Sequence, residues 1–395
     1  MRPDAAEADR NAAVRKAARA WKKAGVIDDA ALAKIEAACP DDRVRVGPVF
    51  RVLLFIFTLV GINAGFGFIL LFFSDAGEYA FATLALVVGA GLVFLTELQT
   101  GLFKRAQGGT EAATSFAALG FLAGGSAWIY SETTGVSFDD VFLAELVLLA
   151  ILCAAAAWRW GYPFYAAVSM AALLGVLAHL PAARLFWIAL AVLAAPVLLR
   201  LEDSPRLPPA LRASATAALV TALAGLYIAV NLQSFDLGAV ELFGDPNRLL
   251  RPETGPPALR TLAAIATALV PAVFLAVGLR TRRRPLLLLG IVTAVASILT
   301  FHTYVDLGPS WLLLVIWGAL TTGTALALRR SLDSGPDHER AGFTAEPLFD
   351  NLERQGVLEA GAALVTFTPE ARVHQEPGFV GGGGEFGGGG SSESF

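Results

Sequence analysis

Runs of apolar residues recur along this chain, and each is close to the length that an α-helix needs to cross a lipid bilayer. A bilayer core about 30 Å thick requires about 20 apolar residues of helix. Because 55% of the residues are hydrophobic and only 16% are charged, the composition excludes an ordinary soluble globular protein. The pattern predicts an all-α, polytopic membrane helix bundle with about ten transmembrane helices. The expected spans are Phe50–Phe73, Tyr79–Leu98, Ala112–Tyr130, Val141–Trp158, Pro163–Leu180, Leu185–Leu199, Leu211–Phe235, Ala258–Leu279, Pro285–Tyr304 and Pro309–Leu328.

Prolines and glycines mark two details within these spans. Leu185–Leu199 is short and carries Pro196 near one end, so it is the weakest of the predicted spans. Gly120 and Gly124 have the small-xxx-small spacing that lets membrane helices approach one another closely. This spacing is frequent in membrane bundles and does not by itself specify a dimer.

Four arginines between the eighth and ninth runs predict the orientation of the whole bundle. Arg280, Arg282, Arg283 and Arg284 lie within five residues, and cytoplasmic loops carry the excess of Lys and Arg. With this topology anchor inside and ten spans, both termini are cytoplasmic. All but four of the 30 Lys and Arg residues then fall on the inner side. The scarcity of Lys beside abundant Arg, Ala, Gly and Leu is typical of a GC-rich bacterium, so we expect a multi-pass protein of the bacterial inner membrane.

The segments outside the spans define the remaining organisation. Residues 1–49 hold no signal peptide, because the first apolar run begins only near Phe50. They predict a short cytoplasmic helical hairpin, Ala12–Ala24 and Asp29–Ala38, with Gly25 ending the first helix and Asp28 or Asp29 capping the second. After the transmembrane domain, 50–328, we expect a cytoplasmic juxtamembrane segment, 329–376. The tail 377–395 is rich in Gly and Phe and is predicted to be disordered.

A short pattern in the hairpin resembles a known family. Trp21-Lys22-Lys23-Ala24-Gly25-Val26-Ile27-Asp28 precedes the block of spans. This Trp-x-x-x-Gly-Val-Ile head is similar to the head of a family of uncharacterised bacterial membrane proteins, the domain of unknown function 2157. The resemblance covers only this N-terminal segment. It implies an integral membrane protein of unknown biochemistry.

The sequence offers little for catalysis. It has no glycine-rich phosphate loop, no Cys-x-x-Cys or His-x-x-x-His metal spacing and no nucleophile elbow. No charged side chain falls at mid-membrane depth, where ion-coupled transporters usually need one. We therefore expect no catalytic residues, no cofactor and no resident metal. The net charge of −4 gives no reason to expect a nucleic-acid partner.

One group of polar residues is expected at the outer ends of the spans. Two imidazoles and two carboxylates among them form a set that can serve a metal, a proton or a lipid headgroup. The alternative is that polar side chains collect at this depth because it is the membrane interface, without converging. The group consists of Glu145, His179, Arg184, Asn231, Gln233, His302, Tyr304 and Asp306.

These features favour a non-catalytic scaffold or sensor in the membrane. Its expected partners are the lipid bilayer and a cytoplasmic protein that contacts residues 1–49 or the C-terminal tail. A transporter or lipid-handling protein that uses the outer polar residues is the alternative, since Pro271 lies in mid-span and transporter helices are often broken there. An intramembrane enzyme ranks third. A polar cavity leading from His302 toward the midplane is the feature that would indicate transport, and a solid core would indicate the scaffold.

Overall fold

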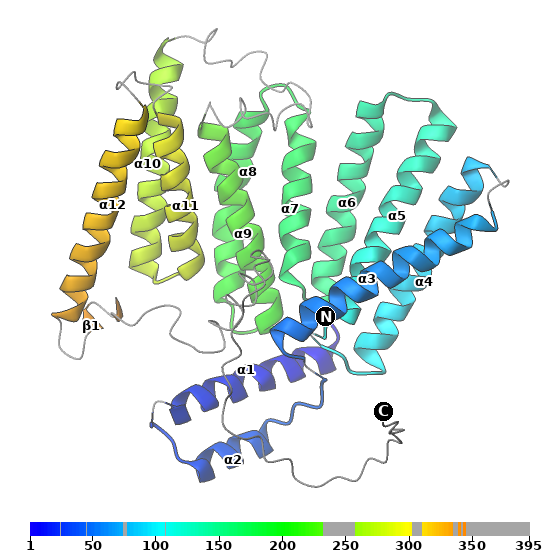
Figure 1. Cartoon of the computed structure of the whole chain (residues 1–395), viewed down its shortest axis with the longest axis horizontal. Helices are drawn as coiled ribbons and strands as arrows, with labels where there is room; N and C mark the ends of the chain where they lie inside the picture. The colour runs from blue at the N-terminus through cyan, green and yellow to red at the C-terminus, as the bar shows by residue number, and fades with distance from the viewer. Residues whose placement is uncertain are drawn as a thin grey trace, which may run out of the picture. The chain divides into compact units, whose positions relative to one another are not determined.

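The computed structural model describes residues 1–23, 25–44, 46–73, 77–106, 108–231, 257–301, 310–334, 339–340 and 343–344. They form helices α1 to α12 and one pair of two-residue strands (Figure 1). The helices are α1 Pro3–Lys23, α2 Asp29–Ala38, α3 Pro48–Leu71, α4 Glu78–Gly101, α5 Thr110–Thr134, α6 Phe138–Trp160, α7 Pro163–Ala178, α8 Ala183–Asp203, α9 Pro209–Val230, α10 Pro257–Thr281, α11 Arg284–Phe301 and α12 Ser310–Asp333. Met1–Ser331 forms one compact unit; in the second, Leu332–Phe395, strand β1 Glu339–Arg340 pairs antiparallel with β2 Phe343–Thr344.

Membrane-length apolar helices dominate the first unit. Among the described residues, seven helices are long and apolar enough to cross a membrane, namely α3 to α6 and α8 to α10. Helices α7 and α11 are apolar but shorter. Each predicted run overlaps one helix of the series α3 to α12. The chain is therefore an all-helical membrane protein with several helices of spanning length, as predicted, while the Gly-rich tail 377–395 lies outside the described residues.

The span expected to be weakest is a full-length helix. Helix α8 runs for 21 residues and continues through Pro196, whereas the sequence predicted only Leu185–Leu199. Proline removes one backbone hydrogen bond, and membrane helices tolerate that loss because neighbouring groups satisfy the freed carbonyl. The predicted span already included Pro196, and the helix extends two residues before that span and four residues beyond it.

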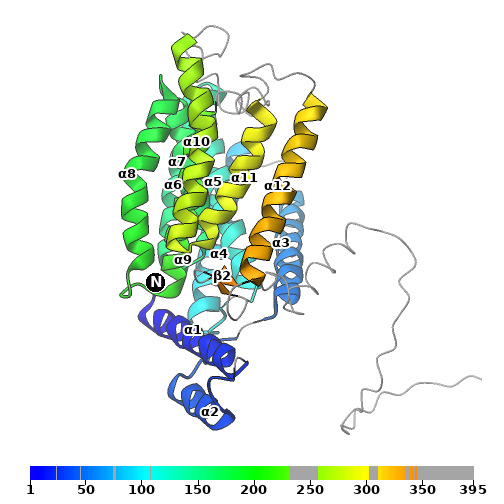
Figure 2. The ribbon, with the colours of Figure 1, turned by 90° about the vertical axis from the view of Figure 1, so that its left-hand side faces the viewer.

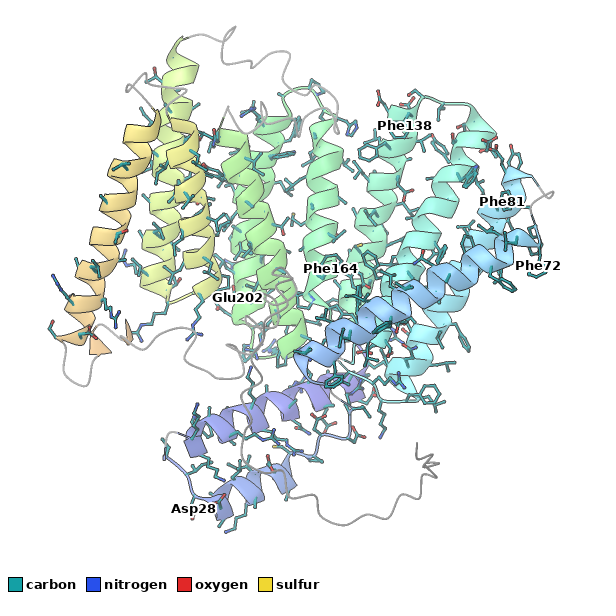
Figure 3. All side chains as sticks on the ribbon, in the orientation of Figure 1. Asp28, Phe72, Phe81, Phe138, Phe164 and Glu202 are labelled. Carbon is teal, nitrogen blue, oxygen red and sulfur yellow. The ribbon has the colours of Figure 1, made fainter. Side chains whose placement is uncertain are left out.

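The N-terminal hairpin differs from its prediction only in its first helix. Helix α1 begins at Pro3, well before the predicted start at Ala12. Proline is favoured in a first turn and the following alanines have the highest helix propensity. Gly25 adopts a positive φ of 72° after α1, and the side chain of Asp28 caps α2 by accepting the backbone N–H of Ala31 at 2.7 Å (Figure 3). The choice between two aspartates as the cap is thus decided in favour of Asp28.

The interior is built from small residues, while large apolar side chains face outward. Ala113, Ala117 and Ala118 are buried on α5, whereas Phe57 on α3 and Leu193 on α8 are largely exposed. This arrangement is typical of helix bundles in lipid, because lipid tails solvate large apolar groups and small residues let helix backbones approach. Sequential helices pack as hairpins, for example α4 with α5 and α10 with α11, and α7 also packs on α9 (Figures 1 and 2).

Close helix approach depends on glycines other than the expected pair. A Cβ added at Gly225 of α9 would lie 2.6 Å from Leu174 Cδ1 of α7, and one at Gly89 of α4 would lie 2.9 Å from Leu122 Cγ of α5. A Cβ at Gly120 or Gly124 would meet no described atom within 4 Å. The small-xxx-small spacing therefore does not mark the packed face of α5.

Helix α1 lies against the ends of several long helices. We call the surface formed by these ends the amino-terminal face, because the N-terminal segment of the chain covers it. This face includes Thr100 near the end of α4, Trp158 near the end of α6 and Ala210 at the start of α9. The amino group of Met1 donates to the Trp158 carbonyl at 2.7 Å, and Asp9 Oδ2 accepts the Ala210 N–H at 2.8 Å. Arg43, which follows α2, donates to the Thr100 carbonyl at 3.3 Å. These contacts attach the N-terminal segment to α4, α6 and α9.

Candidate functional site

Two of the predicted outer residues, Arg184 and Asn231, lie together. Arg184 is only 3% exposed, and its Nη1 donates to the carbonyls of Ala229 at 3.0 Å and Asn231 at 3.2 Å. These carbonyls end α9, where the helix dipole places partial negative charge. Arg184 therefore caps α9 from the neighbouring helix α8. Because Asp9 accepts an N–H at the other end of α9, both ends of this helix carry a charge of the favourable sign.

A chain of hydrogen bonds leads from Asn231 into the bundle. Asn231 Nδ2 donates to Tyr227 Oη at 3.1 Å and to Thr300 Oγ1 at 3.0 Å. Tyr227 Oη lies 2.9 Å from Ser297 Oγ, which in turn lies 2.7 Å from the Thr267 carbonyl. Because the single Ser297 hydroxyl proton goes to a carbonyl, Tyr227 is the donor to Ser297. The chain links α9, α10 and α11 through buried polar groups.

The last hydrogen bond in this series, from Ser297 to Thr267, explains how α10 accommodates its central proline. Pro271 has no N–H, so the carbonyl of Thr267, four residues earlier, lacks its helical partner. The hydroxyl of Ser297 supplies the missing donor from α11. Helix α10 therefore continues through Pro271 from Pro257 to Thr281. The break that the sequence suggested as a transporter feature is absent from this described helix.

The other predicted outer residues do not join Arg184 in the described structure. His179 Nδ1 lies 3.0 Å from the Gly175 carbonyl on its own helix, and its ring lies 6.0 Å from the ring of Phe142. Glu145 lies one turn after Phe142 on α6 and is partly buried. His302 and Asp306, with Gln233 and Tyr304, lie outside the described residues. Among the residues that are described, no group of three His, Cys, Asp or Glu side chains could hold a metal ion.

The topology-anchor arginines form a tight turn between α10 and α11. Arg283 pairs with Glu202 and with both carboxylate oxygens of Asp203, at 2.6 and 2.7 Å, which ties this turn to the end of α8 (Figure 3). Arg282 has a positive φ of 56° at the turn. Arg280, Arg282 and Arg284 are exposed.

A polar cluster that sequence reasoning missed lies on the amino-terminal face and centres on Glu97. This carboxylate accepts Arg159 Nε at 2.8 Å, Arg159 Nη2 at 2.7 Å, Arg2 Nη2 at 2.7 Å and Trp160 Nε1 at 2.9 Å. The Glu97 side chain is only 22% exposed. The arginine on α6 and the arginine that precedes α1 therefore meet on one acid of α4. The aromatic cluster of Trp158, Trp160 and Tyr162 is a sequence signal for a turn at the membrane interface, but it does not indicate which acid the turn would contact.

Local structure positions both arginines of this cluster. The Arg2 guanidinium passes over Gly101, where an added Cβ would lie 1.5 Å from Arg2 Nη1. Gly161, with a positive φ of 75°, ends α6 directly after the Arg159-Trp160 pair. Only glycine adopts this left-handed turn without steric cost. The two glycines thus leave the space and the turn that let the guanidinium groups converge on Glu97.

A second acid, Glu111, is fully buried beside this cluster. It lies in the first turn of α5 and accepts the Gly108 N–H at 2.5 Å and the Tyr162 hydroxyl at 3.4 Å. Burial, followed by the nearby Glu111 carboxylate, raises the pKa of Tyr162 well above its ordinary value. Tyr162 therefore stays protonated and remains a donor to Glu111. This contact links the start of α5 to the turn between α6 and α7.

A cavity of 310 Å³ lies between the N-terminal segment and the ends of α4, α6 and α9. Four arginines line it, Arg2, Arg43, Arg105 and Arg159, together with the acids Asp9 and Glu97. The Arg43 side chain is only 6% exposed and is held by Asp4 at 3.0 Å and by the Thr100 carbonyl. The remaining lining includes Thr100, Trp160, Tyr162, Pro163, Pro209 and Ala210.

Comparison of the chain with protein-family models, with curated proteins and with solved structures gives no match. The resemblance of the Trp21–Asp28 head to the domain of unknown function 2157 stays a prediction.

Proposed function

We propose that this chain is a non-catalytic scaffold or sensor of the bacterial inner membrane, with the helix pair α1–α2 held on its cytoplasmic face. The convergence of Arg2 and Arg159 on Glu97 carries this proposal. It attaches the N-terminal segment to α4 and α6, so that α1 is a fixed part of the molecule. A relationship to the domain of unknown function 2157 family, based on the Trp21–Asp28 head, forms part of this proposal.

The outward side of the helix pair has the character of a protein-binding surface. Val26, between α1 and α2, is 71% exposed, and Val14 and Trp21 on α1 are also exposed. Exposed Trp side chains are enriched at protein interfaces because they bury a large apolar area with few rotatable bonds. A cytoplasmic protein that contacts these three residues is the partner we propose.

We infer that the helix pair lies in the cytoplasm, in a bundle of ten spans. Arg283 pairs with the end of α8, which is joined by a short connection to the start of α9, where Asp9 of α1 bonds. The arginine-rich turn and the hairpin therefore share one face, and the positive-inside rule assigns that face to the cytoplasm. Alkaline phosphatase fused after Phe395 should be inactive, and fusion within 236–257 should be active. The reverse pattern of activities would reject this topology.

Photo-crosslinking in cells tests the scaffold role. A photo-reactive amino acid in place of Val26 should give a protein adduct of discrete mass. The matched control replaces Phe57 of α3, which is equally exposed but lies in a membrane-length helix, and it should crosslink lipid only. Absence of a protein adduct from positions 14, 21 and 26 would contradict the scaffold proposal.

The transporter or lipid-handling alternative is favoured by one observation. The chain from Arg184 through Asn231, Tyr227 and Ser297 carries polar groups from the end of α9 to the middle of α10. In a transporter, water would reach this chain during the cycle. A Ser297→Cys variant without native cysteines would then react with a membrane-impermeant maleimide. No reaction at this position would contradict the transporter alternative and would indicate that this series of hydrogen-bonded side chains is structural.

A further inference from the structure

We propose that the cavity beneath α1 binds a phosphate-bearing anion, either a free phosphate compound or the headgroup of an anionic lipid. The cavity is lined by Arg2, Arg43, Arg105 and Arg159. The proposal goes beyond the scaffold role and does not depend on a protein partner.

The charges of the lining residues leave an excess of positive charge. Four guanidinium groups face two carboxylates, Asp9 and Glu97. Both acids are already engaged, since Glu97 accepts four donors and Asp9 accepts the Ala210 N–H. The helices α7 and α9 also begin at the cavity wall, with Pro163 and Pro209, and helix N-termini contribute further positive potential. Asp4 pairs with Arg43 from outside the lining, so four guanidinium groups stand against three carboxylates, and a bound anion would balance the remaining positive charge.

Arg105 is the cation in this set that is open to a ligand. Its Nη1 donates to Thr110 Oγ1 at 2.9 Å, and within the described residues it forms no ion pair with a carboxylate. Arg105 is exposed. The planar guanidinium group matches the oxygens of a phosphate with two parallel hydrogen bonds. Arg105 therefore provides a free recognition group at the cavity.

Arg43 shows that the site is built into the fold. Its side chain is more than nine-tenths buried, and its Nε has no hydrogen-bond partner among the residues that the structure describes. Holding a buried guanidinium is costly unless its charge is compensated. Asp4 compensates it in part, but Asp4 itself is largely exposed. A bound anion in the cavity would complete the compensation of this buried charge.

The size and position of the cavity fit a small anionic group. Its volume of 310 Å³ is at the lower end of the range of about 300–1,000 Å³ that is typical of ligand sites. The walls come from the ends of membrane-length helices α4, α6 and α9, and in a bilayer that these helices span such ends lie at the depth of lipid headgroups. Because Arg2, Ala5 and Asp9 of the N-terminal segment also line it, a bound anion would hold α1 more tightly against the face.

The test measures ligand-induced protection of α1 in the full chain. The protein is placed in nanodiscs of net-neutral phosphatidylcholine, and inorganic phosphate or pyrophosphate is titrated at constant ionic strength. A second arm uses discs that contain phosphatidylglycerol without added phosphate. Amide hydrogen exchange of α1 reports binding in both arms. Protection in the first arm identifies a free anion, and protection only in the second identifies a lipid headgroup.

Two matched variants decide whether the cavity is responsible. Arg105→Gln should raise the half-saturating concentration of the anion about tenfold, as expected for the loss of a charge-assisted hydrogen bond. Arg206→Gln removes another exposed arginine, in the α8–α9 connection and outside the cavity lining, and should leave binding unchanged. Absence of protection in both arms, or equal weakening by the two variants, would overturn the proposal.

Discussion

Replacing Glu97 by Gln should release α1 from the spanning helices. The carboxylate accepts four hydrogen bonds, and Gln retains one acceptor oxygen while placing an amide donor against the guanidinium groups. Hydrogen bonds to charged groups are worth about 1.5–3 kcal/mol each. Arg2 and Arg159 are 33% and 45% exposed, so solvent screening reduces this contribution. We expect the docking of α1 to weaken by about 2 kcal/mol, which is roughly a 30-fold rise in its opening equilibrium.

Amide hydrogen exchange over the buried positions Ala6, Ala8 and Ala18 measures this opening. The matched control is Glu36→Gln, because Glu36 accepts Arg19 Nε at 2.8 Å and joins α2 to α1. Within the described residues its hydrogen-bond and ion-pair partners, Arg15 and Arg19, both belong to α1. The control should loosen α2 and leave exchange at Ala6 and Ala8 close to that of the unmodified protein. If Glu97→Gln left α1 exchange unchanged, or if both variants opened α1 equally, the Glu97 cluster would not be what holds α1.

Two further substitutions test the packing of the bundle by thermal unfolding in detergent. Ser297→Ala should lower the free energy of unfolding by about 1–3 kcal/mol, because the Thr267 carbonyl loses its donor. Adding Pro271→Ala should recover part of this stability, since the new backbone N–H can bond that carbonyl. A double variant as unstable as Ser297→Ala alone would contradict this account of the proline site. Gly225→Ala should lower the free energy of unfolding by about 1–3 kcal/mol, because its Cβ would lie 2.6 Å from a leucine of α7. The control Gly120→Ala, whose Cβ meets no described atom within 4 Å, should leave the stability unchanged. Equal effects of the two substitutions would show that the contact at α7 is not tight.

The sequence was informative where a single residue type determines local structure. Gly25 and Asp28 mark the end of α1 and the start of α2 because a left-handed turn and an N-cap are properties of these side chains alone. It ranked the span that contains Pro196 as the weakest, whereas α8 is a continuous helix of 21 residues, because the effect of a proline depends on what surrounds the helix. It also brought eight residues into one candidate outer group; four of them are among the described residues, and of these four Arg184 and Asn231 are in contact.

The apolar runs by themselves determined that this chain is a helical membrane protein, because each lipid-exposed segment must satisfy its own backbone hydrogen bonds and only a helix does so within one run. Which helices become neighbours was decided by the tertiary structure. Lipid tails are as apolar as Leu, so the runs carry little information on pairing. The Glu97 cluster joins residues 62 and 95 positions apart, and the Asp9–Ala210 bond joins residues 201 positions apart. Such contacts exist only once α1, α4, α6 and α9 have packed.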